Sequence, residues 1–199
     1  MLGTMKQSAN GMYLITDSGA VIFDSPWDTS PFQPLLDSIN VKHKKNVVMC
    51  IATHSHEDRT SGLTYYRQQG IKTFTTKQTD EISEKNRRPR AEFLIEKDTV
   101  FSVGQYNFQT YYGGEGHTKD NIVIWFNKKK IMYAGCLAKS INAKSMGYVA
   151  EANLEEWSKT IKKVQTKFKN PKFIITGHGN WESIKSLNHT LKLLMKYKE

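Results

Sequence analysis

The sequence has few cysteines and no long apolar run, and both absences narrow the class of protein. Only two cysteines, Cys50 and Cys136, occur in 199 residues, too few for the disulfide framework of a small secreted domain. No apolar stretch approaches the roughly 18 residues that a membrane span requires, so we expect no span. Residues 1–8 also lack the apolar core of a signal peptide. We therefore expect either a cytoplasmic protein or a chain that begins downstream of its export signal.

Acidic residues are scarce relative to basic ones. The chain has 19 Asp and Glu against 29 Lys and Arg, a formal net charge of +10, which raises the question of a nucleic-acid partner. The basic residues occur in separate pieces that coincide with expected turns and polar helix faces, and no aromatic RNA-binding motif is interleaved with them. These pieces are 42–45, 87–90, 128–130, 159–172 and 192–198. We predict a solvated basic surface and no nucleic-acid partner.

The chain is long enough for one sizeable core and short for two, so we predict a single domain over 1–199. The hydrophobic pattern predicts alternating strands and helices, an α/β arrangement. Strands are expected at 12–16, 20–24, 47–52, 71–76, 99–103, 106–111, 122–126, 131–134 and 172–176, and helices at 30–39, 63–69, 80–85, 153–168 and 184–194. Ser30 before Pro31 predicts one helix start, and a capping box of Asn153 and Glu156 predicts another.

The densest chemical signal is the segment Thr53-His54-Ser55-His56-Glu57-Asp58-Arg59, directly after the apolar strand 47–52. His54, His56 and Asp58 recur at every second residue. Alternate side chains of an extended segment point the same way, so we expect these three to converge on one point. Imidazole and carboxylate are ligands that suit zinc. Three of them within five residues favour a metal site over a polar loop with two satisfied histidines.

Further potential ligands follow other strand ends. His117 comes after a glycine-rich turn, Cys136 after a hairpin strand and His178 after the last expected strand. Loops at the strand ends of an α/β scaffold are where functional groups concentrate, and six ligands are enough for two zinc ions. We interpret the remaining histidines differently, His43 as a surface residue and His189 as a structural one.

These motifs resemble the metallo-β-lactamase fold proteins and, within them, the class B β-lactamases of the first subclass. The matching motifs, which lie between about residue 9 and the carboxyl terminus, are 53–59, Gly116-His117-Thr118-Lys119-Asp120-Asn121, Gly135-Cys136-Leu137-Ala138-Lys139-Ser140 and Gly177-His178-Gly179. Cys136 and Arg59 indicate the subclass, because most hydrolases of this superfamily have aspartate and histidine at these positions. The resemblance implies a four-layer αβ/βα sandwich with the metals at one edge between two mixed sheets.

The resemblance also implies two zinc ions per chain and assigns their ligands. The tri-histidine site is matched by His54, His56 and His117, and the second zinc site by Asp58, Cys136 and His178. Lys139 matches the residue that receives the carboxylate of the substrate, so Asp58 and Lys139 are expected as catalytic side chains. Trp27 and Tyr148 are expected beside Lys139 at the substrate. Asp120 and Asn121 match positions that help to hold the neighbouring loops.

The implied reaction is hydrolysis of the β-lactam amide bond by zinc-bound hydroxide, which would confer resistance to β-lactam antibiotics, carbapenems included. Three neutral imidazoles leave zinc strongly positive and lower the pKa of its water towards ~7. The second zinc, with its thiolate and carboxylate ligands, would stabilise the nitrogen anion released on ring opening. The resemblance implies a periplasmic protein, which we expect to be a monomer, acting on small-molecule β-lactams.

The chain departs from the family pattern at two places. Tyr148 stands where many members have an asparagine proposed to assist the oxyanion, so we expect zinc to carry that role. Members also have strands before the first hairpin, which this chain is expected to lack, leaving the lid over the site incomplete. Two alternatives stay open: another hydrolase of the superfamily, such as a thioesterase or a nuclease, and a non-catalytic zinc-binding domain.

Overall fold

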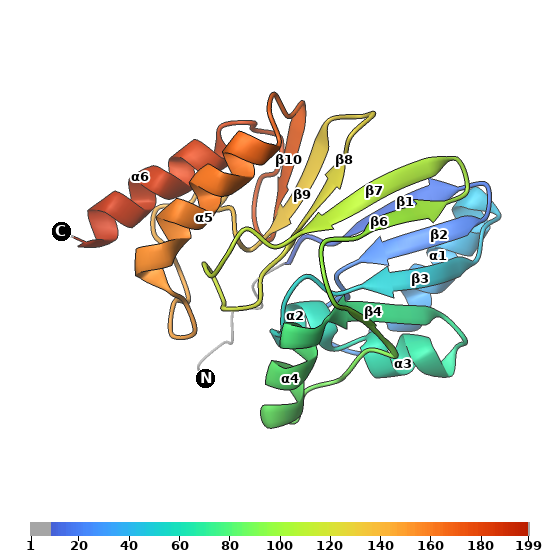
Figure 1. The fold of residues 1–199 in the computed structure, drawn as a ribbon. Helices are drawn as coiled ribbons and strands as arrows, with labels where there is room; N and C mark the ends of the chain where they lie inside the picture. Colours follow the sequence, from blue (N-terminus) through green and yellow to red (C-terminus); the bar gives the residue numbers. More distant parts are fainter. Residues whose placement is uncertain (1–8, 199) are drawn as a thin grey trace, which may run out of the picture.

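The computed structural model describes residues 9–198, which form two five-stranded mixed sheets facing each other (Figure 1). The first sheet has the order β1 (Met12–Thr16), β2 (Gly19–Phe23), β3 (Val47–Ile51), β4 (Lys72–Thr76) and β5 (Phe93–Ile95). β1 runs antiparallel to β2, and the other neighbours are parallel. The helices of this half are α1 (Phe32–His43), α2 (Glu57–Thr60), α3 (Leu63–Gln68) and α4 (Lys77–Lys85).

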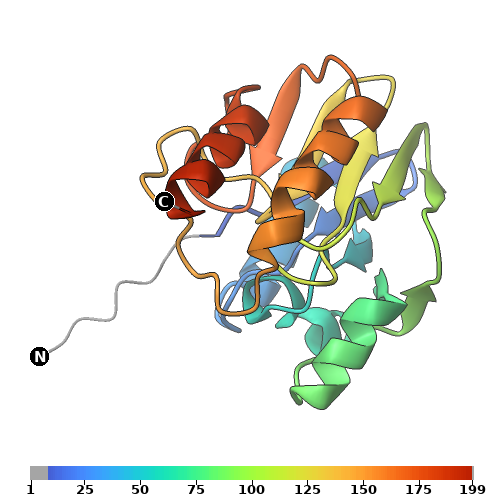
Figure 2. The same ribbon diagram turned by 60° about the vertical axis from the view of Figure 1, so that its left-hand side comes forward.

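The second sheet comes from the second half of the chain. Its order is β10 (Phe173–Thr176), β9 (Ile131–Gly135), β8 (Val123–Phe126), β7 (Tyr106–Tyr111) and β6 (Val100–Val103). Only the pair β9 and β10 is parallel. Helices α5 (Leu154–Lys167) and α6 (Ser186–Lys198) lie side by side on its outer face, as both Figure 1 and Figure 2 show. The side chains of Gln165 and Asn188 join these two helices by a hydrogen bond of 2.7 Å.

Three apolar clusters hold the layers together. One lies between the two sheets, where the ring of Phe23 packs edge-on against Phe108 and Phe126 at centroid distances of 5.1 and 5.6 Å. A second joins the first sheet to α1 and α3, and a third joins the second sheet to α5 and α6 around Trp157. Burial of these apolar faces is the main stabilising contribution. The predicted four-layer αβ/βα sandwich is thus confirmed.

The segment that carries Asp58 is not extended, contrary to the sequence prediction. His56 has extended backbone angles, but Glu57 and Asp58 form the first turn of α2. Acidic side chains stabilise the first turn of a helix, where the backbone N–H groups are unpaired, and this outweighs continuation of the strand. The ligands therefore converge because the chain turns after His56, and not because side chains alternate along a strand.

Two helix starts also differ from their predictions. Ser30 does not cap α1, which begins at Phe32; its N–H instead bonds to the carboxylate of Asp28 at 3.0 Å, a local turn that competes with capping. α6 begins at Ser186, so the expected face residue Ile184 precedes the helix and is exposed. The Asn153 cap of α5 is confirmed, since its side chain accepts a bond from the Glu156 N–H at 3.1 Å.

β5 was not predicted from the sequence, because three residues are too short for a periodic signal.

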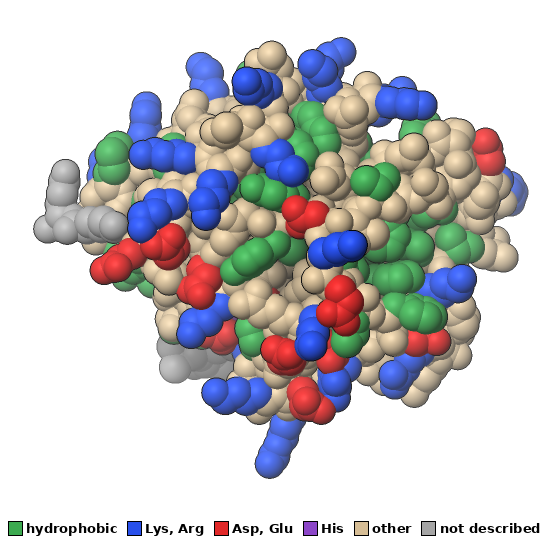
Figure 3. Space-filling model, viewed as in Figure 1, with side chains coloured by type: hydrophobic (Ala, Val, Ile, Leu, Met, Phe, Trp, Pro, Cys, Tyr) green, Lys and Arg blue, Asp and Glu red, His purple; other side chains and the backbone are tan. Residues whose placement is uncertain are grey.

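Lys and Arg side chains are spread over many elements on the face drawn in Figure 3, with acidic side chains among them. Among the described residues, no helix is both long enough and apolar enough to cross a membrane.

Candidate metal centre

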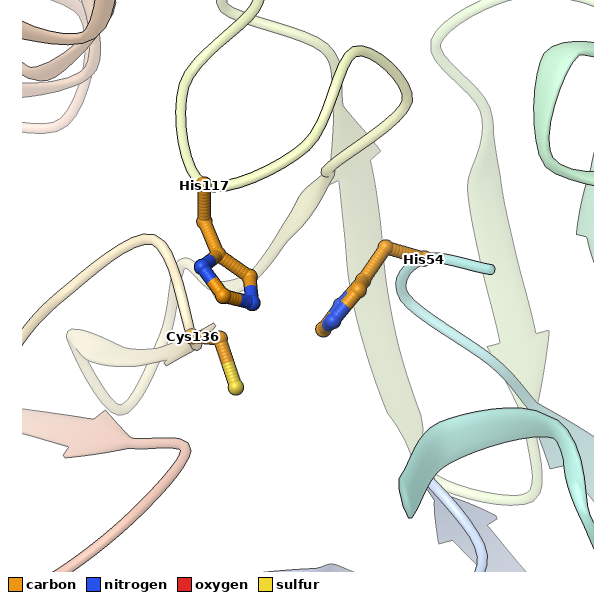
Figure 4. Close-up of side chains that lie close together, drawn as sticks. All are labelled: His54, His117 and Cys136. Atoms are coloured by element: carbon orange, nitrogen blue, oxygen red, sulfur yellow. The ribbon is translucent and has the colours of Figure 1, made fainter. Parts of the chain in front are cut away.

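All six expected ligands lie at one edge of the sandwich, where strands of both sheets end. His54 and His56 follow β3, and Asp58 lies on α2. Cys136 follows β9, His178 follows β10, and His117 lies in the loop between β7 and β8. Figure 4 shows His54, His117 and Cys136 with their side chains directed toward one another.

The three histidines form one compact cluster. The ring centroids are 4.8 Å apart for His54 and His56, 5.1 Å for His54 and His117, and 4.9 Å for His56 and His117. Nδ1 of His56 lies 3.2 Å from Nε2 of His117. Two imidazole nitrogens bound to one tetrahedral zinc at about 2.0–2.1 Å would be roughly 3.3 Å apart. The spacing of these nitrogens therefore fits a shared metal ion.

Burial and protonation of the cluster point the same way. In the described part of the chain, Nε2 of His54 is buried without a hydrogen-bond partner, which is costly for a polar atom. Burial lowers the pKa of His54 and of His117 well below the ordinary range, reinforced by the neighbouring histidines at His54 and by the Lys139 ammonium at His117. Burial also lowers the pKa of His56. The rings are thus neutral at neutral pH, the form that binds metal.

A second cluster combines Asp58, Cys136 and His178, whose ligand atoms all lie within 4.8 Å of one another. Oδ2 of Asp58 lies 3.1 Å from Nε2 of His178. Burial raises the pKa of Asp58, but the contacts with His178 and Arg59 lower it by more. The net pKa is below the ordinary value, so the carboxyl stays ionised. Burial lowers the pKa of His178, yet its bonds to Asp58 and Cys136 raise it to about 10. Oxygen, sulfur and nitrogen donors of this kind suit zinc.

Arg59 lies beneath this second cluster, fully buried. Its Nη2 donates to Sγ of Cys136 at 2.9 Å and lies 2.9 Å from Oδ2 of Asp58. The sequence singled out Arg59 only as a marker of the subclass. In the structure the guanidinium supplies the positive charge that the buried carboxylate of Asp58 needs and a hydrogen bond to the Cys136 sulfur.

Asp24 was not identified from the sequence, although it follows the end of β2 just as the ligands follow other strands. Its carboxylate accepts bonds from Thr53 N–H at 2.7 Å and from the Tyr133 hydroxyl at 2.7 Å, and it lies 3.4 Å from Nη1 of Arg59. Asp24 is buried and ties the start of the His54 segment to the second sheet. The rule that functional groups follow strand ends could have found it.

A pair of charged residues supports the outer side of the histidine cluster. Oε2 of Glu151 lies 3.3 Å from Nε2 of His56, and Oε1 accepts a bond of 3.1 Å from Arg88, which also donates to the Ser55 carbonyl. The sequence interpretation placed Arg88 in an exposed basic break, but its side chain is only 18% exposed. No sequence signal links Arg88 to Glu151, because they are 63 positions apart in the sequence.

The expected substrate-contacting residues lie around the two clusters. Trp27 and Tyr148 are half exposed and line a hollow of about 270 Å³ with His56, Asp58 and Glu151. A neighbouring hollow of about 660 Å³ contains Lys139, Tyr148 and Cys136. Burial lowers the pKa of Lys139, whose Nζ lies 5.3 Å from the centre of the Trp157 ring. The clusters are thus open to a small molecule from two sides.

Asp120 and Asn121 take positions inside the loop that carries His117. The side chain of Asn121 accepts a bond from Thr118 N–H and donates to the Gly114 carbonyl, both at 3.0 Å. Asp120 is fully buried, and its carboxylate accepts a hydrogen bond of 3.5 Å from the Ser55 hydroxyl.

The other two histidines lie apart from the ligands. Nε2 of His43 is 3.3 Å from the Tyr13 hydroxyl, and Nε2 of His189 is 2.8 Å from the Ala143 carbonyl.

Comparison with known proteins identifies the family. No protein-family model matches the chain. A protein of Elizabethkingia meningoseptica named metallo-beta-lactamase type 2 is 41% identical over 194 residues, covering 98% of this chain and 78% of that protein. Metallo-beta-lactamase IND-1 of Chryseobacterium indologenes is also 41% identical, over 98% of this chain and 82% of its own length. The chain belongs to the metallo-β-lactamase family. The chain is therefore a hydrolase of class B, as its motifs predicted.

Solved structures of metallo-β-lactamases have the same fold. The crystal structure of metallo-beta-lactamase IND-7 superposes with a TM-score of 0.94 at 40% identity, covering 98% of this chain and 89% of that chain. A metallo-beta-lactamase from Pontibacter korlensis gives a TM-score of 0.91 at 31% identity, with 95% and 93% covered. The metallo-β-lactamase fold of this chain therefore rests on sequence and structural similarity together.

Proposed function

We propose that the chain hydrolyses the amide bond of β-lactams at a centre that holds two zinc ions. The first would be held by the tri-histidine cluster and the second by Asp58, Cys136 and His178. The observation that carries the proposal is the adjacency of these two ligand sets, one made of neutral imidazoles and one containing a carboxylate and a thiol. Names of the relatives give the substrate class, since each is called a metallo-beta-lactamase.

Zinc held there would supply a Lewis acid for the lactam carbonyl and would lower the pKa of a water molecule towards ~7. The side chains of the chain contribute orientation and charge. Asp58, ionised because His178 and Arg59 lower its pKa, can accept a hydrogen bond from a water molecule and orient it. Glu151 fixes the ring of His56 through the contact at Nε2. Such fixed donors and acceptors need little reorganisation during the reaction.

Lys139 is proposed to bind the substrate carboxylate. Its ammonium is a compact positive charge at the wall of the larger hollow, beside Cys136 and Tyr148. Burial excludes water from Lys139 and so strengthens its attraction for an anion. Trp27 and Tyr148 would cover the apolar part of the substrate from the adjoining smaller hollow. We extend the proposal to carbapenems, because both hollows are open and Lys139 requires only the carboxylate.

The test is a hydrolysis assay with zinc content measured on the same sample. The purified chain with zinc is expected to open a chromogenic cephalosporin, a penicillin and a carbapenem, to lose activity with a chelator and to regain it with zinc. A thioester and a single-stranded nucleic acid serve as alternative substrates. Absence of β-lactam turnover in a sample with two zinc ions per chain would overturn the proposal, as would preferred turnover of either alternative. The periplasmic location and monomeric state stay predictions.

A further inference from the structure

Asn10 forms three hydrogen bonds to the loop that carries His178. Its backbone N–H donates to the Gly177 carbonyl at 2.8 Å, and its side-chain Nδ2 donates to the carbonyls of Thr176 at 2.9 Å and Gly179 at 2.7 Å. The preceding residue, Ala9, forms an isolated antiparallel bridge with His178 itself. Carbonyls on both sides of His178 are therefore held by one residue from the beginning of the described chain.

The other side of Asn10 contacts the residues beneath the second ligand cluster. Its carbonyl accepts a bond from Nη1 of Arg59 at 2.9 Å and another from the Tyr133 hydroxyl at 2.9 Å. Arg59 in turn donates to Cys136 and pairs with Asp58. Asn10 thus connects the two parts of the cluster, the His178 loop on one side and the Asp58 and Cys136 pair on the other.

The His178 loop needs such an anchor because its own backbone is permissive. Glycine precedes and follows His178, and Gly179 has a φ of 70°, in the left-handed region. Glycine restricts the backbone less than any other residue, and the side chain of His178 is 35% exposed. Backbone preference alone therefore does not fix this ligand, and contacts with other segments hold its loop. The Gly177 N–H donates to the Gly135 carbonyl at 2.7 Å, and Nη2 of Arg59 donates to the Gly177 carbonyl at 3.0 Å. The hydrogen bonds from Asn10 add to these contacts and join the carbonyls on both sides of His178.

We propose that Asn10 is a positioning residue for the second metal ion, holding His178 at the correct distance from Asp58 and Cys136. This inference rests on the two-zinc centre proposed above. Partners that orient metal ligands contribute about 10- to 100-fold to metal affinity. The tri-histidine site has no hydrogen bond to Asn10 among the described residues, so we expect its affinity to change much less than that of the second site.

The experiment measures the two metal affinities separately in Asn10→Ala and Asn10→Asp. Asn10→Asp keeps the shape of the side chain but replaces the donor with a carboxylate facing two carbonyl oxygens. Zinc or cobalt is titrated against a competing chelator, and the thiolate-to-cobalt absorption band reports binding at Cys136. Both variants are expected to bind the second ion about 10- to 100-fold more weakly, with the first ion unaffected. Asn40→Ala is the matched control, since it removes an exposed side-chain hydrogen bond from the amide of Asn40 to Asn46.

Backbone hydrogen exchange of the metal-free chain gives a readout that needs no metal. Exchange in residues 176–180 is expected to be faster in Asn10→Ala and unchanged in Asn40→Ala. Equal weakening of both metal ions, or no weakening of the second, would overturn the inference and leave Asn10 a general stabilising residue. The parent chain is titrated first; uptake of a single ion by the parent overturns the two-zinc proposal itself, which separates the two failures.

Discussion

Nη2 of Arg59 donates a hydrogen bond to Sγ of Cys136 at 2.9 Å, although the two residues are 77 positions apart in the sequence. The same guanidinium pairs with Asp58 and faces Asp24, and both carboxylates are buried. A single cation thus compensates the negative charges beneath the second ligand cluster. Removal of one partner from a buried ion pair leaves the other charge uncompensated. The resulting loss of stability is larger than the net stabilisation that the intact pair provides.

We expect Arg59→Met to lower the free energy of unfolding of the metal-free chain by about 3–5 kcal/mol. The physical reason is that Asp24 and Asp58 stay buried without their cation. Urea unfolding followed by circular dichroism measures this change. Arg67→Met is the matched control, because Arg67 is exposed on α3. Similar unfolding midpoints for the two variants would show that Arg59 does not stabilise the fold.

Cys136→Ser is expected to abolish binding of the second metal ion and to leave the first in place. Serine has nearly the shape of cysteine, but its hydroxyl does not ionise at neutral pH as a metal-bound thiol does. Zinc content after dialysis at limiting chelator should fall from two ions to one. Cys50→Ala serves as the control, since Cys50 is a buried thiol of the core outside both clusters. Loss of both ions from Cys136→Ser would contradict our division of the ligands.

Gly177→Ala is expected to displace Cys136. A Cβ atom at residue 177 would lie 2.5 Å from Sγ of Cys136 and 2.8 Å from Nη2 of Arg59. Real Cβ atoms do not approach so closely, so either the thiol or the loop must move. Affinity for the second ion should fall, as measured by chelator competition. Gly70→Ala is the control, since a Cβ there meets nothing within 4 Å although its φ of 75° makes alanine strained; it should lower stability without changing metal affinity.

The sequence predicted much of this centre because its ligands obey a local rule. His54, Cys136 and His178 follow strands whose apolar pattern is visible in the sequence, and the carboxyl ends of these strands meet at one edge. Local chemistry also defined most helices, such as α5 with its Asn153 cap. The resemblance added Lys139, which no local pattern distinguishes from a solvated lysine.

Contacts between distant segments could not be predicted in the same way. Asn10 lies next to Gly177 although the two are 167 positions apart in the sequence, and Arg88 pairs with Glu151, 63 positions away. Neither residue has a neighbour in sequence that indicates its partner. The turn at α2 was also missed, since four residues give no helical periodicity and the spacing of His54, His56 and Asp58 equally fits a strand.

Glu151→Gln is expected to weaken the tri-histidine site rather than the second site. The carboxylate fixes the ring of His56 and raises its basicity as a ligand, and such partners contribute about 10- to 100-fold to affinity. Arg88 and His56 lower the pKa of Glu151 despite its partial burial, so the residue is ionised at neutral pH. Chelator competition for the first ion measures the effect, with the exposed Glu155→Gln on α5 as control. An unchanged first affinity would remove Glu151 from metal binding.

Lys139→Glu tests how the substrate is held. The reversed charge faces the hollow beside Cys136, and loss of a charge-assisted hydrogen bond costs about 1.5–3 kcal/mol. We expect the KM for a β-lactam carboxylate to rise by roughly 10- to 100-fold with a smaller change in kcat. Lys144→Glu, an exposed lysine of the same loop, should leave KM unchanged. A β-lactam whose carboxylate is esterified should be hydrolysed with the same KM by Lys139→Glu and by the parent; a rise in KM for the ester as well would mean that the substitution disturbs the site and not the carboxylate contact.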